Sequence, residues 1–244
     1  MNKKVAIFLS VIIVVCLIAL ESFLFSPQEY RENVKVARVI DGDTLETYDG
    51  RIFRLANINT PEHGEQGYEM AKDFLKSYEN KTLEIVALGT DKYARTLARL
   101  YEPDYVNLRM VEEGLASKFL VDKHELKKFA LAEKQAIAEG KGRWRKSPYI
   151  GCVQTHIDAE LEQVALLNEC PAISMQGWKI KDESRKTYIF SLPFKAITLH
   201  SGVGKDNATD RYWGSTTIWN NDRDSLYFFD ADGGLAQYES YGYE

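Results

Sequence analysis

Residues 34–62 read VKVARVIDGDTLETYDGRIFRLANINTPE, and this stretch decides how the first half of the chain folds. Its opening run, residues 34–40, has apolar side chains on both of its alternating faces, which predicts a barrel strand. The DGDT sequence at 41–44 follows as a turn, because Asp-Gly is a strong hairpin signal. Residues 51–58 form the next strand-like run. The stretch therefore predicts barrel strands with polar turns between them.

Further strand-like and helix-like segments follow this stretch. Apolar residues at three- and four-residue steps predict helices over 68–78 and 106–115. A third helix is predicted after Asp122-x-x-Glu125, a variant of the capping box, with Gly140 as its end. Strands followed by helices predict an α+β barrel-like domain over residues 33–147. The other strand candidates are residues 82–88 and 95–101.

The character of the sequence changes after Ser147-Pro148. Helical periodicity fades, and short β-rich runs alternate with Asn, Asp, Gly and Ser turns, which predicts a β-sandwich. The charge changes as well: residues 33–149 carry 20 Lys and Arg against 19 Asp and Glu, whereas residues 150–244 carry 8 against 14. We therefore expect a second, all-β domain over residues 150–244.

The N-terminus carries the long apolar run of the chain. Lys3 and Lys4 precede residues 5–20, which hold no charge. A basic start before an apolar core indicates export, so residues 1–25 are predicted to be a signal peptide or, as we prefer, an uncleaved transmembrane anchor. Residues 26–32 then form a tether. The rest of the chain is expected on the extracellular face of the cell membrane, or secreted.

Composition limits the classes of function. With 45% hydrophobic and 27% charged residues among 244, the chain is an ordinary globular sequence, and a net charge of −5 argues against a polycation that coats nucleic acid. Three Cys exclude a disulfide-dense scaffold. Outside the cytoplasm, Cys152 and Cys170 can form a disulfide that closes a loop of about 18 residues. Two unpaired thiols are the alternative.

Several polar residues fall on the predicted turns between barrel strands. Taken singly, each has an ordinary explanation as a turn residue or a surface charge. Together they supply oxygen ligands for a hard divalent cation, a carboxylate that can take a proton from water, and guanidinium groups that bind phosphate. These are the requirements of phosphodiester hydrolysis. The residues are Asp41, Asp43, Arg54, Asn59, Thr60, Glu62 and Arg95.

The same residues lie in motifs whose order and approximate spacing resemble the thermonuclease (staphylococcal or micrococcal nuclease) family. The motifs are DGDT at 41–44, FRL at 53–55, NTPE at 59–62, DKYAR at 91–95, VEEGLA at 111–116, His124-Glu125 and Trp144. The resemblance covers about residues 33–147 and implies an OB-fold barrel with three helices. It also implies an endonuclease, a phosphodiesterase that requires Ca2+ and cleaves both DNA and RNA.

The resemblance implies a role for each matching residue. Carried over by motif, Asp43 and the carbonyl of Thr60 would bind Ca2+ directly, with Asp41 in the outer shell. Glu62 would be the general base, and Arg54 and Arg95 would bind the scissile phosphate. Lys92 and Tyr93 would contact a nucleotide's phosphate and sugar.

Three features bear on metal and substrate binding. Asn59 stands where the family has a second aspartate ligand. Its amide oxygen can still bind Ca2+, but one negative charge is lost, so weaker Ca2+ binding is predicted.

The family's stacking tyrosines before His124 are missing, and Phe119 is either a base platform in their place or a core residue. Lys and Arg gather over residues 118–146, as a patch that tracks phosphates or as a solvated helix face with Glu133 and Glu139 interspersed.

The second domain resembles the lamin-tail domain, an immunoglobulin-like β-sandwich, over roughly residues 152–242. The patterns that carry this resemblance are GWKIKD at 177–182 and WNNDRD at 219–224. It implies a non-catalytic binding or stability module and names no ligand.

The sequence as a whole predicts a membrane-tethered or secreted, Ca2+-dependent nuclease of extracellular DNA and RNA with an appended β-sandwich. The alternative is a non-catalytic protein on the same fold, either a binder of single-stranded nucleic acid or a surface interaction protein led by the second domain. Retention of Glu62 favours the enzyme, because a binder has little need for a positioned base.

Overall fold

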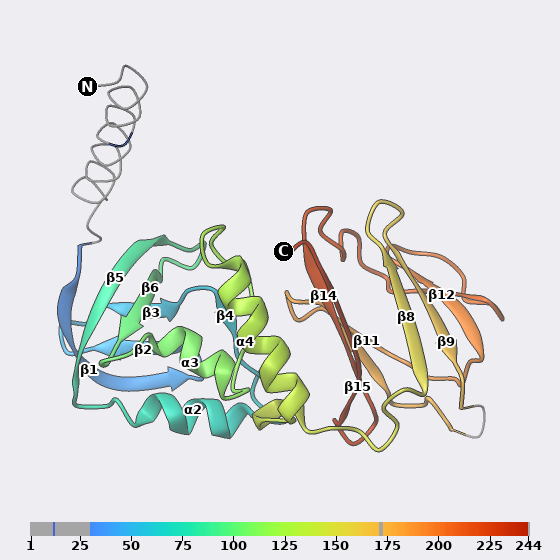
Figure 1. Ribbon diagram of the computed structural model, residues 1–244, viewed down its shortest axis with the longest axis horizontal. Helices are drawn as coiled ribbons and strands as arrows, with labels where there is room; N and C mark the ends of the chain where they lie inside the picture. The colour runs from blue at the N-terminus through green and yellow to red at the C-terminus, as the bar shows by residue number, and fades with distance from the viewer. Residues whose placement is uncertain (1–11, 13–29, 171–172, 244) are drawn as a thin grey trace, which may run out of the picture.

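The computed structural model describes residue 12, residues 30–170 and residues 173–243. Apart from residue 12, the predicted signal or anchor segment therefore lies outside the described residues, as does most of the tether. Among the residues described, no helix is long and apolar enough to cross a membrane. Figure 1 shows a barrel with its helices at one end of the molecule and β-sheets at the other, with α4 (Leu126–Glu139) between them.

Five strands close the barrel, in the order β1-β2-β3-β6-β5. All neighbours are antiparallel except β3 and β6, which are parallel. The predicted barrel and its turn at residues 41–44 are confirmed. The run predicted at 51–58 is broken into β3 and β4 (Ile58–Asn59), because Asn57 adopts a left-handed backbone with φ 69°. The barrel strands are β1 (Glu32–Asp41), β2 (Thr44–Thr47), β3 (Ile52–Leu55), β5 (Thr82–Thr90) and β6 (Thr96–Tyr101).

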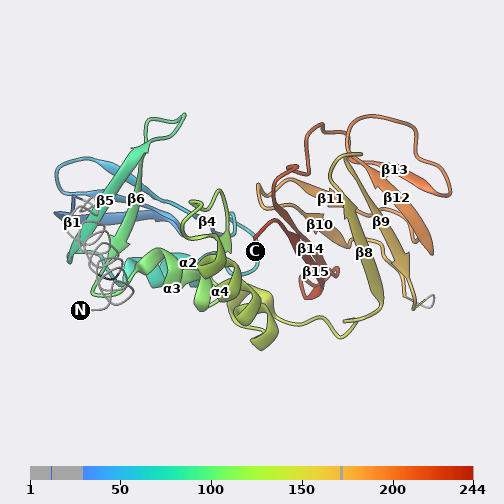
Figure 2. The ribbon, with the colours of Figure 1, turned by 45° about the horizontal axis from the view of Figure 1, so that its top comes forward.

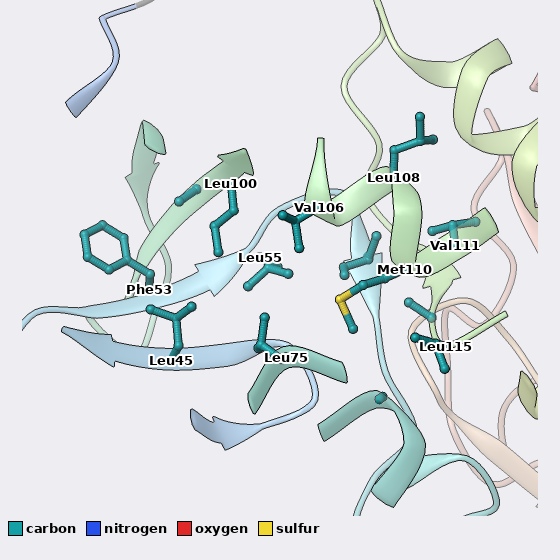
Figure 3. Packing of buried hydrophobic residues seen from close by; sticks show 14 of the residues in the cluster. Leu45, Phe53, Leu55, Leu75, Leu100, Val106, Leu108, Met110, Val111 and Leu115 are labelled. Atoms are coloured by element: carbon teal, nitrogen blue, oxygen red, sulfur yellow. The ribbon is translucent and has the colours of Figure 1, made fainter. Parts of the chain in front are cut away.

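Aliphatic and aromatic side chains fill the barrel and the space beneath its helices. Leu45, Phe53 and Leu55 of the barrel belong to one buried cluster with Leu75 of α2 (Tyr68–Lys76) and Met110 of α3 (Val106–Glu112) (Figure 3). All five side chains are fully buried. Burying a side chain of this size stabilises the fold by about 1.5–3 kcal/mol. The core thus fixes the strands whose ends carry the polar turns.

Helix α4 ends where predicted but does not start as predicted. Gly140 ends it in a left-handed backbone with φ 69°. The predicted capping box is wrong, because no side chain caps the first turn. The Glu125 carboxylate instead accepts hydrogen bonds from Asn57 at 2.7 Å and Arg99 at 2.9 Å. Before α4 lies β7 (Ser117–Lys118), which pairs with β4, and after it comes η1 (Gly142–Trp144).

The second half of the chain forms two four-stranded sheets, β11-β10-β14-β15 and β13-β12-β9-β8. Neighbours are antiparallel except β12 and β13. One buried cluster holds Leu166 and Leu199 from one sheet and Phe228 from the other, so the sheets share a core. The strands are β8 (Val153–Asp158), β9 (Gln163–Asn168), β10 (Lys179–Lys181), β11 (Thr187–Ile189), β12 (Ala196–His200), β13 (Asp210–Tyr212), β14 (Asp224–Phe229) and β15 (Leu235–Tyr241).

A disulfide joins Cys152 and Cys170, with Cα atoms 5.2 Å apart. It confirms the pairing that the sequence left open against two free thiols. The two cysteines flank the antiparallel pair β8 and β9. The bond therefore ties the open end of that hairpin.

The two halves share an apolar interface beside α4. Trp144 of η1 stacks on Tyr227 of β14 with ring centroids 5.1 Å apart, and Ala136 and Leu235 lie in the same buried cluster. Figure 2 shows α4 next to β14 and β15 from a second angle. The second half is therefore held against the barrel domain by a small core of its own.

A buried ionic cluster crosses the same interface. Lys118 Nζ lies 2.5 Å from a Glu133 carboxylate oxygen and 3.2 Å from one of Glu183, and it donates to Ser225 Oγ at 2.6 Å. Lys118 and Glu133 are both 0% exposed. Residues 118–146 are interpreted from sequence as a patch that tracks phosphates or as a solvated helix face, and for Lys118 and Glu133 both interpretations are wrong. Burial alone would lower the pKa of Lys118, but the charges of its partners, Glu133 first, raise it.

Candidate active site

The turn at residues 41–44 lies directly against Thr60. Asp41 Oδ1 accepts a hydrogen bond from the Asp43 amide at 3.0 Å, and Asp43 Oδ2 accepts one from the Thr60 amide at 3.1 Å. A Cβ at Gly42 would lie 2.7 Å from Thr60 Oγ1, so a larger residue would push the turn away. The end of β1 and the residue after β4 are thereby brought together.

Arg54 lies beneath this turn and is 7% exposed. Its Nη2 is 3.1 Å from Asp43 Oδ2 and donates to Asn59 Oδ1 at 2.6 Å. Burial lowers the pKa of Arg54 and Asp43 opposes this, whereas the charges of Arg185 and Arg95 lower it further. Arg185 and Arg95 therefore lie close enough to repel the Arg54 guanidinium, and an anion placed beside Arg54 would relieve that repulsion.

Asp41 and Asp43 form the acidic part of the site. Burial, followed by the charge of Asp43, raises the pKa of Asp41 above its ordinary value. Within the described part of the chain, no three His, Cys, Asp or Glu gather as a metal cluster. The oxygens available here are two carboxylates with the Thr60 carbonyl and the Asn59 amide, a set that suits a hard cation such as Ca2+. A cation would also offset the repulsion that raises the pKa of Asp41, so the residues fit the predicted metal.

Asn59 uses both ends of its amide. It is 1% exposed, its Oδ1 accepts from Arg54, and its Nδ2 donates to the backbone carbonyl of Glu183 at 2.8 Å. An amide oxygen has two acceptor sites, so the Arg54 contact leaves one for a cation. The amide nitrogen, however, is needed by the second domain, and a carboxylate would set two acceptor oxygens against each other there.

Glu62 lies at the outer edge of the site. Its side chain is 61% exposed, and its Oε1 lies 2.6 Å from Nη1 of Arg185, a residue of the second domain. The same Arg185 nitrogen donates to the Thr60 carbonyl at 3.4 Å. The predicted base and the predicted carbonyl ligand therefore meet at one guanidinium group.

Arg95 reaches the site from the β5–β6 loop. Asp91 accepts from its Nε at 2.8 Å and lies 2.7 Å from its Nη2, while its Nη1 makes a long contact of 3.5 Å with Thr44 Oγ1. Thr44 follows Asp43, so Arg95 lies beside the acidic turn. Tyr93 is 68% exposed, and the charged ends of Lys92 and Arg95 lie 5.0 Å and 5.4 Å from its ring centroid. Lys92, Tyr93 and Arg95 thus form a continuous cationic and aromatic edge.

The structure brings the predicted residues of the barrel domain into one connected site. Sequence reasoning missed Arg185 and Glu183, which reach this site from the second domain. Their only signal in the sequence is a turn-like run of charged residues, 182–186, after the GWKI pattern. Nothing in that run indicates which residues of the first domain it would contact.

Comparison with known proteins supports this description of the first domain. Residues 52–146 match the family model described as staphylococcal nuclease homologue. They belong to a staphylococcal nuclease-like domain. Two curated relatives, from Escherichia coli and Escherichia coli O157:H7, are each described as an uncharacterized endonuclease and are 38% identical to this chain over 88 residues. The match covers 34% of this chain and 58% of each relative, so it spans little more than half of their length.

Proposed function

We propose that this protein is a Ca2+-dependent endonuclease that hydrolyses phosphodiester bonds of extracellular DNA and RNA. The observation that carries the proposal is that the guanidinium groups of Arg95 and Arg185 lie at Thr44 and at the Thr60 carbonyl, around the buried Asp43–Arg54 pair and next to Glu62. Such a site attracts a phosphate and holds a carboxylate beside it. The nuclease-like domain at residues 52–146 and the endonuclease name of the relatives support the same reaction.

Each residue has a task that its position allows. Glu62, exposed at the rim, takes the proton from a water molecule that attacks phosphorus. Arg54 donates to the scissile phosphate from below, and Arg95 donates from the β5–β6 loop to a phosphate oxygen and the leaving oxygen. Lys92 and Tyr93 bind the neighbouring phosphate and sugar.

The acidic turn is the place for the metal. Asp43, Asn59 and the Thr60 carbonyl would hold Ca2+, with Asp41 in the outer shell. Bound there, the ion would offset the negative charge that develops on the phosphate in the transition state. The Asp41 and Asp43 hydrogen bonds to the turn amide and to Thr60 fix these oxygens before substrate arrives.

The second domain and the cell location belong to the proposal as well. The two sheets with a shared core support a lamin-tail-like, immunoglobulin-like sandwich that binds or stabilises without catalysing. The Cys152–Cys170 disulfide supports an oxidising compartment. With the predicted N-terminal anchor, the nuclease would act at the outer face of the membrane, on nucleic acid outside the cell.

Cleavage of single-stranded DNA by the full-length chain tests the proposal. We expect cleavage with Ca2+, none after chelation, and a loss of about 100-fold or more in Glu62→Gln, which keeps the shape of the side chain but removes the base. Glu69→Gln is the matched control, because Glu69 is an exposed glutamate in the first turn of α2. Binding of the strand without cleavage at millimolar Ca2+ would favour the non-catalytic binder instead.

A further inference from the structure

The turn between β10 and β11 of the second domain enters the candidate active site. Asp182, which is 2% exposed, holds this turn by accepting hydrogen bonds from the Lys186 amide at 2.7 Å and from Ser184 Oγ at 2.6 Å. Arg185 adopts a left-handed backbone with φ 74°, a conformation that non-glycine residues rarely take. Non-glycine residues in this region cost about 1–3 kcal/mol and cluster at functional sites.

Three of the contacts between this turn and the barrel domain involve residues of the candidate site. The Glu183 carbonyl accepts from Asn59 Nδ2 at 2.8 Å. Arg185 donates to the Thr60 carbonyl at 3.4 Å and forms an ion pair with Glu62 at 2.6 Å. The turn therefore contacts the predicted metal ligands Asn59 and Thr60 and the predicted base Glu62 directly.

The position of the turn is fixed from behind. The Glu183 carboxylate lies 3.2 Å from Lys118 Nζ and accepts from Ser225 Oγ at 2.7 Å and from Tyr243 at 2.6 Å. Its amide donates to Asp224 Oδ1 at 3.3 Å. A buried network with its partners in place permits one arrangement and resists others. Arg185 is thus presented to the site by a rigid support.

The Glu62 carboxylate needs such a partner. It lies on a loop, its side chain is 61% exposed, and within residues 30–170 and 173–243 Arg185 is the one ion-pair partner it has. A base that is free to rotate in solvent spends little time in the geometry that proton transfer needs. Arg185 is itself 34% exposed, so the pair faces the solvent from which substrate comes.

We propose that Arg185 is a positioning residue of the nuclease site, which holds Glu62 beside the Thr60 carbonyl so that the second domain completes the active site. This inference rests on the proposed function. Its expected consequence is that the second domain is required for catalysis and is more than a separate binding module. The opposite reading of the same contact is an autoinhibitory clasp, which the experiment below separates by the sign of the effect.

The test replaces Arg185 by glycine in the full-length chain. Glycine suits the left-handed backbone, so the turn is retained while the guanidinium is lost. We expect kcat on single-stranded DNA to fall about 10- to 100-fold with little change in KM, because a misplaced base slows the reaction without weakening binding. Arg185→Lys should recover part of the rate, since a lysine can still pair with Glu62. Lys186→Ala is the control, because Lys186 Nζ donates to Thr217 of the second domain and not to the barrel.

A double variant shows whether Arg185 acts through Glu62. In the Glu62→Gln background, adding Arg185→Gly should slow the residual reaction no further, whereas a structural or phosphate-binding role would slow it in both backgrounds. Additive losses would overturn the proposal, as would a kcat equal to that of the unchanged protein. A faster enzyme would identify the turn as a clasp. If Glu62→Gln itself has no effect on the rate, the proposed function has failed. If Glu62→Gln slows the reaction but Arg185→Gly does not, only the role proposed for Arg185 has failed.

Discussion

Asn59→Asp separates the metal binding proposed for Asn59 from its contact with the second domain. The substitution restores the negative charge that the family has at this position, so we expect half-maximal cleavage at a lower Ca2+ concentration. An added carboxylate ligand raises the attraction for a divalent cation, although Arg54, 2.6 Å away, neutralises part of the new charge. A gain of about 1 kcal/mol, or roughly fivefold in Ca2+ concentration, is expected.

The same substitution should weaken the protein when Ca2+ is removed. The Asn59 Nδ2 hydrogen bond to the Glu183 carbonyl is lost at a site that is 1% exposed, and the carbonyl keeps no donor there. An unsatisfied buried group costs about 1–3 kcal/mol, and a stronger, charge-assisted bond to Arg54 recovers about 1 kcal/mol. The midpoint of that cost less the recovery is a net loss of about 1 kcal/mol, and at about 2–4 °C per kcal/mol for a chain of this size, Tm should fall by roughly 2–4 °C.

Two measurements decide between these expectations. Thermal unfolding in chelator gives the stability effect, and cleavage rate against Ca2+ concentration gives the metal effect. Asn33→Asp is the matched control, because Asn33 is exposed on β1 and takes the same change of charge. An Asn59→Asp protein that needs as much Ca2+ as the unchanged one would show that this side chain is no ligand. An unchanged Tm in chelator would show that the amide does not hold the two domains together.

Three further predictions follow from the interface and the second domain. Lys118→Met leaves two buried glutamates without their cation, so unfolding should be easier by about 3–5 kcal/mol in denaturant; a loss below 1 kcal/mol would contradict the buried network. Burial raises the pKa of Asp224 to about 6, so the native state holds more protons than the unfolded chain between pH 4 and 6. The unfolding free energy should therefore rise as pH falls from 7 to 5, and Asp224→Ala should flatten that slope; an equal slope would refute the assignment. Removing the disulfide with Cys152→Ser and Cys170→Ser should cost about 3 kcal/mol, measured as a lower Tm than the oxidised protein, and an unchanged Tm would contradict it.

The sequence predicts those parts of the fold that depend on neighbours along the chain. The turn at 41–44 and the stop at Gly140 are set by local backbone preferences, which single residues reveal. The prediction of a site in the barrel domain rests on the resemblance, because its motifs occur in a known order. The capping box failed because Glu125 finds better partners in Asn57 and Arg99, far away in the sequence. Local patterns cannot show such competition.

The contacts between the domains could not be predicted for the same reason. In the sequence, Lys118 is one of several cations in a basic stretch. Only the fold shows that it is buried and pairs with Glu183 of the second domain. Arg185 lies more than a hundred residues from Glu62 in the chain and in a segment with no catalytic pattern. Each contact depends on how the two domains pack against each other. The spacing of charges within either domain gives no information about that packing.

The contacts between the domains also change the meaning of Asn59. From sequence alone, an asparagine in place of an aspartate ligand is the one feature that favours a lost metal site. The structure supplies a different physical reason for the amide, because its nitrogen donates to the Glu183 carbonyl while its oxygen still faces Arg54 and the acidic turn. In the barrel domain alone, the Asn59 amide nitrogen would lose this acceptor. Asn59 and the β10–β11 turn are therefore coupled: under the proposed function, the amide lowers the attraction for the cation and at the same time joins the second domain to the site.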